Sequence, residues 1–107
     1  MSGTITTGNS CSLRYWKITG TITGAVNTTM TLSYPTGCSF ANIVAVYGTF
    51  NYGTYIMPFN NTYFQLAGNQ INNVCLYIDT SAINIVIMSG AINVVGSAYS
   101  IIIVTSS

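Results

Sequence analysis

The residues best suited to chemistry lie between Tyr47 and Tyr55, where the sequence reads YGTFNYGTY. Aromatic rings at Phe50 and Tyr52 alternate here with glycines, hydroxyls and the Asn51 amide. Tyrosine supplies rigid, amphipathic contact area, and Asn and Gly supply adaptable hydrogen bonding. Such a surface can stack on the C–H face of a sugar and bond its hydroxyls. The segment therefore predicts non-covalent ligand binding.

A second polar and aromatic segment follows at Asn60 and Asn61, which precede Thr62 and Tyr63. Asn-rich turns also arise from backbone needs alone, because Asn tolerates positive φ and bonds its own backbone. Tyr47, Phe50 and Tyr55 of the first segment have an alternative too, as core residues or cross-strand pairs of an ordinary hairpin. The candidate ligand-binding residues are Asn51, Tyr52, Phe50, Tyr55, Asn60 and Asn61.

The inventory of titratable side chains argues against catalysis. The sequence has no His, no Glu and a single Asp, Asp79, whereas general acid–base catalysis needs a group that titrates near the working pH. The three cysteines, Cys11, Cys38 and Cys75, form no C-x-x-C pair, so we expect no metal site and no cofactor. Small buried thiols are expected, with an interchain or Cys11–Cys38 disulfide as the alternative.

Charge is unusually scarce, at 3% of residues against roughly 25% in ordinary globular domains. The charged side chains are Arg14, Lys17 and Asp79, and the net charge is +1. Nucleic acid is not an expected partner, because neutralising phosphates takes several cations. Arg14 and Asp79 are a candidate ion pair, and Lys17 lies on the polar face of its strand. No apolar run reaches the ~18 residues of a membrane-spanning helix, so membrane insertion is not expected.

Hydrophobic alternation sets the fold class. Between residues 13 and 23, Trp16, Ile18 and Ile22 share one parity, while Tyr15 and Lys17 share the other with a run of threonines. This period of two is typical of a half-buried β-strand. About eight such segments, bounded by Gly, Pro or Asn, favour a sandwich or a small barrel. They are residues 13–23, 28–34, 43–50, 54–59, 63–66, 74–79, 82–88 and 99–104.

We predict an all-β fold, a small antiparallel β-sandwich of jelly-roll type. Residues 43–50 and 54–59 form its central hairpin, with Asn51 and Gly53 in the turn. Pro58 places the second of these strands at a sheet edge, because proline donates no ladder hydrogen bond. At 107 residues the chain is one domain, residues 12–107, preceded by a Gly-, Ser- and Thr-rich linker at residues 1–11.

The order of features is similar to that of a known family. A Trp-Lys-Ile strand at residues 16–18 precedes TTMTLSYP at residues 28–35, ANIVAV at residues 41–46 and GSAYSIIIV at residues 96–104. In this order the chain resembles the C-terminal tip domain of bacteriophage tail fibres. The resemblance implies a homotrimer that assembles in the host cytoplasm, belongs to the virion and binds a bacterial surface glycan or an outer-membrane protein. Residues 1–11 would then be the end of the fibre shaft.

The near absence of charge also fits a surface shared with identical copies. We expect the isoleucine-rich strand 83–88, or strand 101–104, to lie against neighbouring protomers. The alternative function is purely structural, as a subunit of a self-assembling viral or extracellular filament or as a capsid decoration.

Overall fold

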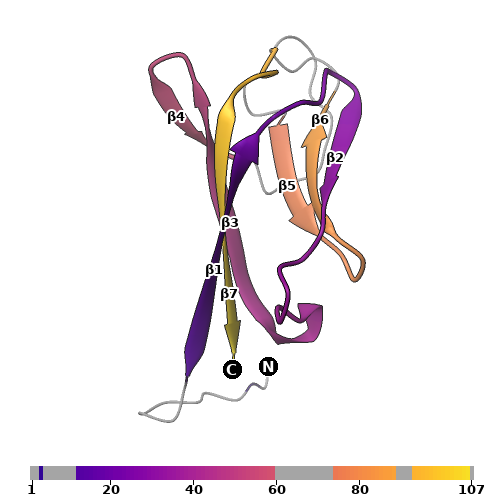
Figure 1. The fold of residues 1–107 in the computed structure, drawn as a ribbon, viewed down its shortest axis with the longest axis vertical. Helices are drawn as coiled ribbons and strands as arrows, with labels where there is room; N and C mark the ends of the chain where they lie inside the picture. Colours follow the sequence, from indigo (N-terminus) through magenta and orange to yellow (C-terminus); the bar gives the residue numbers. More distant parts are fainter. Residues whose placement is uncertain (1–2, 4–11, 60–73, 89–92, 107) are drawn as a thin grey trace.

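A computed structural model describes residue 3 and residues 12–59, 74–88 and 93–106, and it confirms the predicted β-sandwich. One sheet has four strands in the order β1-β7-β3-β4, and the other has three in the order β2-β6-β5 (Figure 1). All of their pairings are antiparallel. The elements are β1 (Leu13–Thr21), β2 (Thr28–Leu32), the 3-10 turn η1 (Phe40–Asn42), β3 (Ile43–Tyr52), β4 (Tyr55–Pro58), β5 (Val74–Ile78), β6 (Ile83–Ile87) and β7 (Ala98–Ser106). The predicted strand 63–66 lies outside the described residues.

The last strand, β7, holds the four-stranded sheet together. It pairs with β1 along its full length, from Leu13 opposite Ser106 to Thr21 opposite Ala98. Its other side pairs with β3, from Ile43 opposite Thr105 to Phe50 opposite Tyr99. The two ends of the domain are therefore adjacent strands, and β7 is longer than the predicted 99–104 because it has a partner on each side.

In the three-stranded sheet, a short turn joins β5 to β6 as a hairpin. The Asp79 carboxylate accepts hydrogen bonds from the backbone N–H groups of Ser81 and Ala82, at 2.8 and 2.9 Å. The Tyr34 hydroxyl donates to the Asp79 and Ala82 carbonyls, at 2.5 and 3.2 Å. Asp79 therefore shapes this turn from within, and Tyr34 ties the turn to the chain beyond β2.

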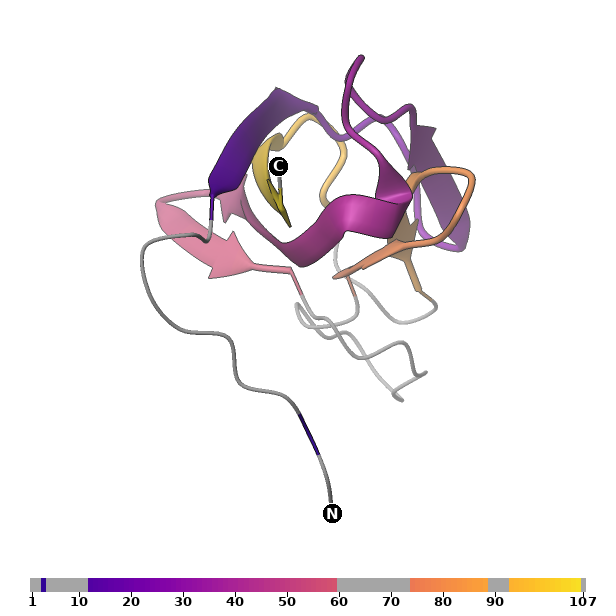
Figure 2. The ribbon, with the colours of Figure 1, turned by 90° about the horizontal axis from the view of Figure 1, so that it is seen from below.

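The core lies between the two sheets, which Figure 2 shows end-on as two layers. The inner face of β7 contributes Tyr99, Ile101 and Ile103, and β6 contributes every second residue from Ile83. Trp16, Ile18, Met30 and Leu32 pack against this cluster from β1 and β2, as their alternation predicts. In the described part of the chain, the largest fully buried side chains are Phe50, Ile22, Ile83, Ile85, Ile87, Ile101, Ile103, Val74, Val94 and Cys75.

Most isoleucines of the two strands predicted to face neighbouring protomers are buried within a single chain. The isoleucines of β6 and those at 101 and 103 of β7 are buried between the sheets of a single chain. Both strands are also central in their sheets, so neither offers a free edge. The expectation that these isoleucines form contacts between protomers is therefore wrong, because they build the core of each protomer.

The β3–β4 hairpin forms as predicted, with a shorter turn. Tyr52 pairs with Tyr55, so only Gly53 and Thr54 form the loop. Gly53 has a φ of 59° at the first loop position, which is the requirement of a type II′ hairpin turn. Asn51 and Tyr52 belong to strand β3 rather than to the turn, and β4 with Pro58 is the edge strand of its sheet.

Close packing of β3 on β7 depends on one glycine. A Cβ added at Gly48 would lie 2.6 Å from the Ser100 carbonyl oxygen and 3.2 Å from the Ile101 Cα. These are backbone atoms of the central strand, which cannot move aside without breaking the ladder. Gly48 therefore permits the close approach of β3 to β7 just before the hairpin begins.

The burial of Phe50 gives a stability prediction. Phe50→Ala is expected to lower the free energy of unfolding by about 3–5 kcal/mol, because it leaves a cavity where β3 meets the core. Urea denaturation of the purified domain measures the change. Asn51→Ala, one residue away on the exposed face, is the matched control and should stay within about 0.5 kcal/mol of the parent chain. Equal, small effects of the two substitutions would contradict this placement of Phe50.

Candidate functional site

The tip of the β3–β4 hairpin extends away from the rest of the four-stranded sheet (Figure 1). Tyr55 and Ile56 are two of its most exposed side chains, with 64% and 72% of their surface accessible. Asn51 lies opposite Ile56 in the ladder, so the two share one face of the hairpin. Tyr55 shares the other face with Tyr52. Exposed rings and amides thus occupy both faces of one projecting element.

Phe50 is a core residue and not part of this exposed tip. Its side chain is fully buried, and its ring centroid lies 5.2 Å from that of Phe59 in a tilted arrangement. Phe50 faces the three-stranded sheet because it shares the inward parity of Val46 on β3. A ligand on the surface does not reach this ring, so the role that the structure gives Phe50 is packing.

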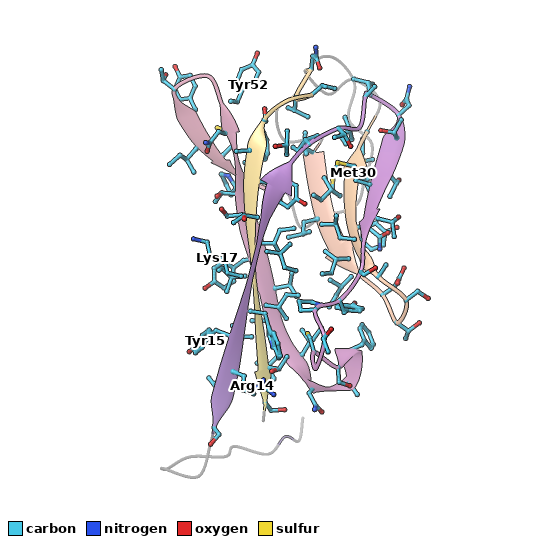
Figure 3. All side chains as sticks on the ribbon, viewed as in Figure 1. Arg14, Tyr15, Lys17, Met30 and Tyr52 are labelled. Carbon is cyan, nitrogen blue, oxygen red and sulfur yellow. The ribbon has the colours of Figure 1, made fainter. Side chains whose placement is uncertain are left out.

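The remaining predicted residues divide by exposure. Tyr52 is half-buried and packs against the core, and Figure 3 shows its ring beside the hairpin tip. Asn51 and Tyr55 are exposed and available to a ligand. Asn60 and Asn61 lie outside the described residues. The hairpin therefore brings Tyr52 and Tyr55 together on one face and places Asn51 on the other.

A second exposed surface lies on the outer face of the four-stranded sheet. We call it the tyrosine strip and define it as Tyr15 and Lys17 of β1, Ile102 of β7 and Tyr47 of β3. In the ladders, Lys17 and Tyr47 lie on either side of Ile102, and Tyr15 is two residues from Lys17 along β1. Tyr15 is 67% exposed and Tyr47 is 58% exposed. Ile102, which lies between β1 and β3, is half-buried. Figure 3 shows Tyr15 and Lys17 on the side of β1 that faces away from the second sheet.

Sequence reasoning missed the tyrosine strip as a unit. Lys17 and Tyr15 were placed correctly on the outer face of their strand, and Tyr47 was assigned to the hairpin segment. The three side chains come together because β7, from the far end of the chain, separates β1 from β3 by a single strand. The signal present in the sequence was the outward parity of each tyrosine, but parity alone does not identify the neighbouring strand.

Within one chain, Arg14 and Asp79 do not form the predicted ion pair, and each makes a separate local interaction. The Arg14 guanidinium lies 4.6 Å from the centroid of the Trp16 ring, which is a cation–π contact. The Asp79 carboxylate instead accepts the N–H groups of its own turn, and these bonds hold its pKa below the ordinary value. Each of these two charged side chains thus interacts with residues two or three positions away in the sequence.

Burial affects two further titratable groups near the end of β2. Desolvation raises the pKa of the Tyr34 phenol, and the nearby charges of Asp79 and Cys38 raise it further. Desolvation also raises the pKa of the Cys38 thiol, although the Arg14 charge acts in the opposite direction. The buried Cys75 thiol lies 3.4 Å from the Met88 sulfur, on the face of β5 and β6 away from the main core. The Cys38 thiol therefore lacks the lowered pKa of a reactive cysteine.

Metal and membrane chemistry are not indicated by the described part of the chain. There, no three His, Cys, Asp or Glu side chains are grouped closely enough to hold a metal ion. No helix in these ranges is long and apolar enough to cross a membrane. What the exposed surfaces supply is aromatic rings, amides, hydroxyls and one ammonium group.

Comparison with known proteins adds no further constraint. No family model, no curated protein and no solved structure matches this chain. The functional argument therefore rests on the hairpin tip and the tyrosine strip.

Asp79 is the only acidic side chain in the sequence, which makes its pH dependence simple to test. Its pKa is lower in the folded state than the ~3.9 of an unfolded chain. The stabilisation is therefore complete above that unfolded value and is lost as pH falls through the folded pKa. We expect the melting temperature to fall below about pH 4. Asp79→Asn should melt at a lower temperature near neutral pH and show a flatter acid limb; an unchanged acid limb would contradict the assignment.

Proposed function

We propose that this chain is a recognition domain that binds a cell-surface receptor non-covalently, as the tip of a bacteriophage tail fibre does. The observation that carries the proposal is the projecting β3–β4 hairpin, which leaves Tyr55 and the Asn51 amide accessible. The resemblance in the order of the strand sequences supports the phage assignment. The proposed receptor is a glycan of the bacterial surface, with an outer-membrane protein as the alternative.

The mechanism follows from the side chains at the tip. The Tyr55 ring offers a flat apolar face on which the C–H face of a sugar can stack. The Tyr52 hydroxyl and the Asn51 amide supply donors and acceptors, and an amide can do both at once. A short type II′ turn holds these groups on paired strands, so little conformational freedom is lost on binding. Individual contacts of this kind are weak, and several copies on one virion would multiply them.

We further propose that the domain works as a homotrimer. The charged side chains of the sequence number only three, so repulsion between charges does little to keep copies apart. The isoleucines of β6 and those at 101 and 103 of β7 are buried in the core of one chain and do not support this contact. Among the described strands, β1, β4, β2 and β5 lie at the edges of the two sheets, and edge strands are the ones that can pair with another chain.

One observation favours the structural alternative. β1 is a nine-residue strand at the edge of the four-stranded sheet, and an edge of this length is a template for pairing with another chain. Edge pairing that does not close into a ring produces an open filament. A self-assembling filament subunit therefore remains the second candidate. Electron microscopy separates the two, because open polymers favour the filament and discrete particles favour the receptor-binding domain.

Receptor binding by the hairpin predicts a selective loss of adsorption. Asn51→Ala combined with Tyr55→Ala should reduce binding of the labelled domain to receptive bacteria by about tenfold or more. Tyr52→Phe, which keeps the half-buried ring and removes only the hydroxyl, should reduce it less. The measurement is flow cytometry of labelled cells. Thr29→Ala, an exposed position on β2, is the control. Adsorption that is unchanged by all of these substitutions would rule out the hairpin as the receptor site.

The trimer predicts a sedimentation coefficient and mass for three chains at micromolar concentration. Analytical ultracentrifugation measures this directly. A single species with the mass of one chain would contradict the trimer and leave the receptor-binding proposal to the adsorption experiment.

A further inference from the structure

The tyrosine strip is an exposed apolar surface with one charge in it. Tyr15 and Tyr47 expose more than half of their surface, on strands that lie on either side of β7. Ile102 forms the floor between Lys17 and Tyr47, and Val104 forms it beside Tyr15. Val104 is only 7% exposed although it belongs to the outer face. Two rings thus lie beside aliphatic side chains, with the Lys17 ammonium group on the same face.

The dimensions of the strip suit a single extended polymer. β1 and β3 are two strand spacings apart, about 10 Å, and the step from Tyr15 to Lys17 along β1 is about 7 Å. Beyond Lys17 the outward residues become polar, with Thr19 opposite Ser100. The strip has four residues, whereas a stable protein interface takes about 20–30 residues from each partner, so a protein partner would have to contact neighbouring surface as well.

The charge of the strip also argues against a second copy of this chain. Lys17 is the only charged side chain on the strip, since Arg14 has the opposite parity and stacks on Trp16. The only acidic side chain of the sequence is Asp79, which lies at the β5–β6 turn of the other sheet and already accepts three hydrogen bonds. A second strip would therefore offer no carboxylate to pair with Lys17, whereas an acidic ligand would.

We propose that the tyrosine strip binds one chain of an acidic polysaccharide whose sugar rings carry carboxylates. Successive parts of the polymer would stack on Tyr15 and Tyr47, because these rings are too far apart for one sugar to cover both. The Lys17 ammonium would pair with a ring carboxylate between them, as a charge-assisted hydrogen bond. The hydroxyls of Thr19 and Ser100 lie next along the same face. This site is separate from the hairpin tip and stands whether or not the hairpin binds a receptor.

Binding is tested with immobilised domain and three carboxylate-bearing polymers, polygalacturonate, polymannuronate and polysialate, each beside its methyl-esterified form. At least one acidic polymer should bind, and its ester should bind roughly three to ten times more weakly because the pairing with Lys17 is lost. Raising NaCl toward about 0.5 M should weaken the acidic form more than the ester. Failure of all three acidic polymers to bind would overturn the proposal.

Variants locate the site on the strip. Lys17→Gln should weaken binding of the acidic polymer by roughly threefold to tenfold and leave its ester unchanged, while Lys17→Arg should restore most of the loss. Tyr15→Ala and Tyr47→Ala should each weaken both forms by about tenfold, through lost stacking. The control is Thr29→Ala, an exposed position on β2 of the other sheet, which should leave polymer binding as it is, and Tyr55→Ala tests whether the hairpin contributes. Thermal melts confirm that each variant is folded.

Three results would overturn the assignment to the strip. Unchanged polymer binding by Lys17→Gln would show that the Lys17 charge does not contribute to binding. Equal losses in Tyr55→Ala and Tyr15→Ala would move the site to the hairpin or spread it over the whole surface. Dissociation of an oligomer by Tyr15→Ala or Tyr47→Ala, seen by sedimentation, would show that a second copy of the chain covers this face.

Discussion

The pairing of β7 with both β1 and β3 is the interaction on which the rest of the domain depends. It joins the last strand to the first, so the four-stranded sheet exists only when both ends of the chain are in place. Its inner face supplies Tyr99, Ile101 and Ile103 to the core, and its outer face supplies the floor of the tyrosine strip. Contacts between residues so distant in sequence carry a large loop-closure cost before they stabilise anything. The core on one side and the candidate surface on the other therefore form together.

Because the chain has so few charged side chains, the interaction that each one makes can be identified. Arg14 stacks on Trp16, and Asp79 organises the β5–β6 turn through backbone bonds. Lys17 is the cation that remains on an exposed face, beside two tyrosines from different strands. In a chain with so few charges, one exposed ammonium dominates the local potential, because nothing nearby opposes it. The proposals for the hairpin and for the strip thus differ in electrostatic character, one neutral and the other able to select an anion.

Prediction from the sequence was most accurate where a strand has one buried face and one solvent-exposed face. The alternation of Trp16 and Ile18 with Tyr15 and Lys17 assigned both faces of β1 correctly. It was least accurate at the hairpin, where the apolar run from residue 43 hides the period of two. Phe50 was grouped with exposed rings for this reason, although its burial follows once the register with β7 is known. The isoleucines of β6 and those at 101 and 103 of β7 were likewise recognised as apolar, but they pack in the core of one chain and not against a neighbour.

The sequence by itself determined the fold class, most of the strands, the β3–β4 hairpin with its edge proline, and the shortage of groups for acid–base chemistry. These follow from local properties, namely side-chain parity, turn residues and composition, which act over a few positions of the chain. Only the tertiary structure decided that the C-terminal strand lies between the first and third, and hence that Tyr15, Lys17 and Tyr47 share one surface. That outcome depends on pairing between segments far apart in the sequence, and a period of two records which face a residue takes but not which strand lies beside it.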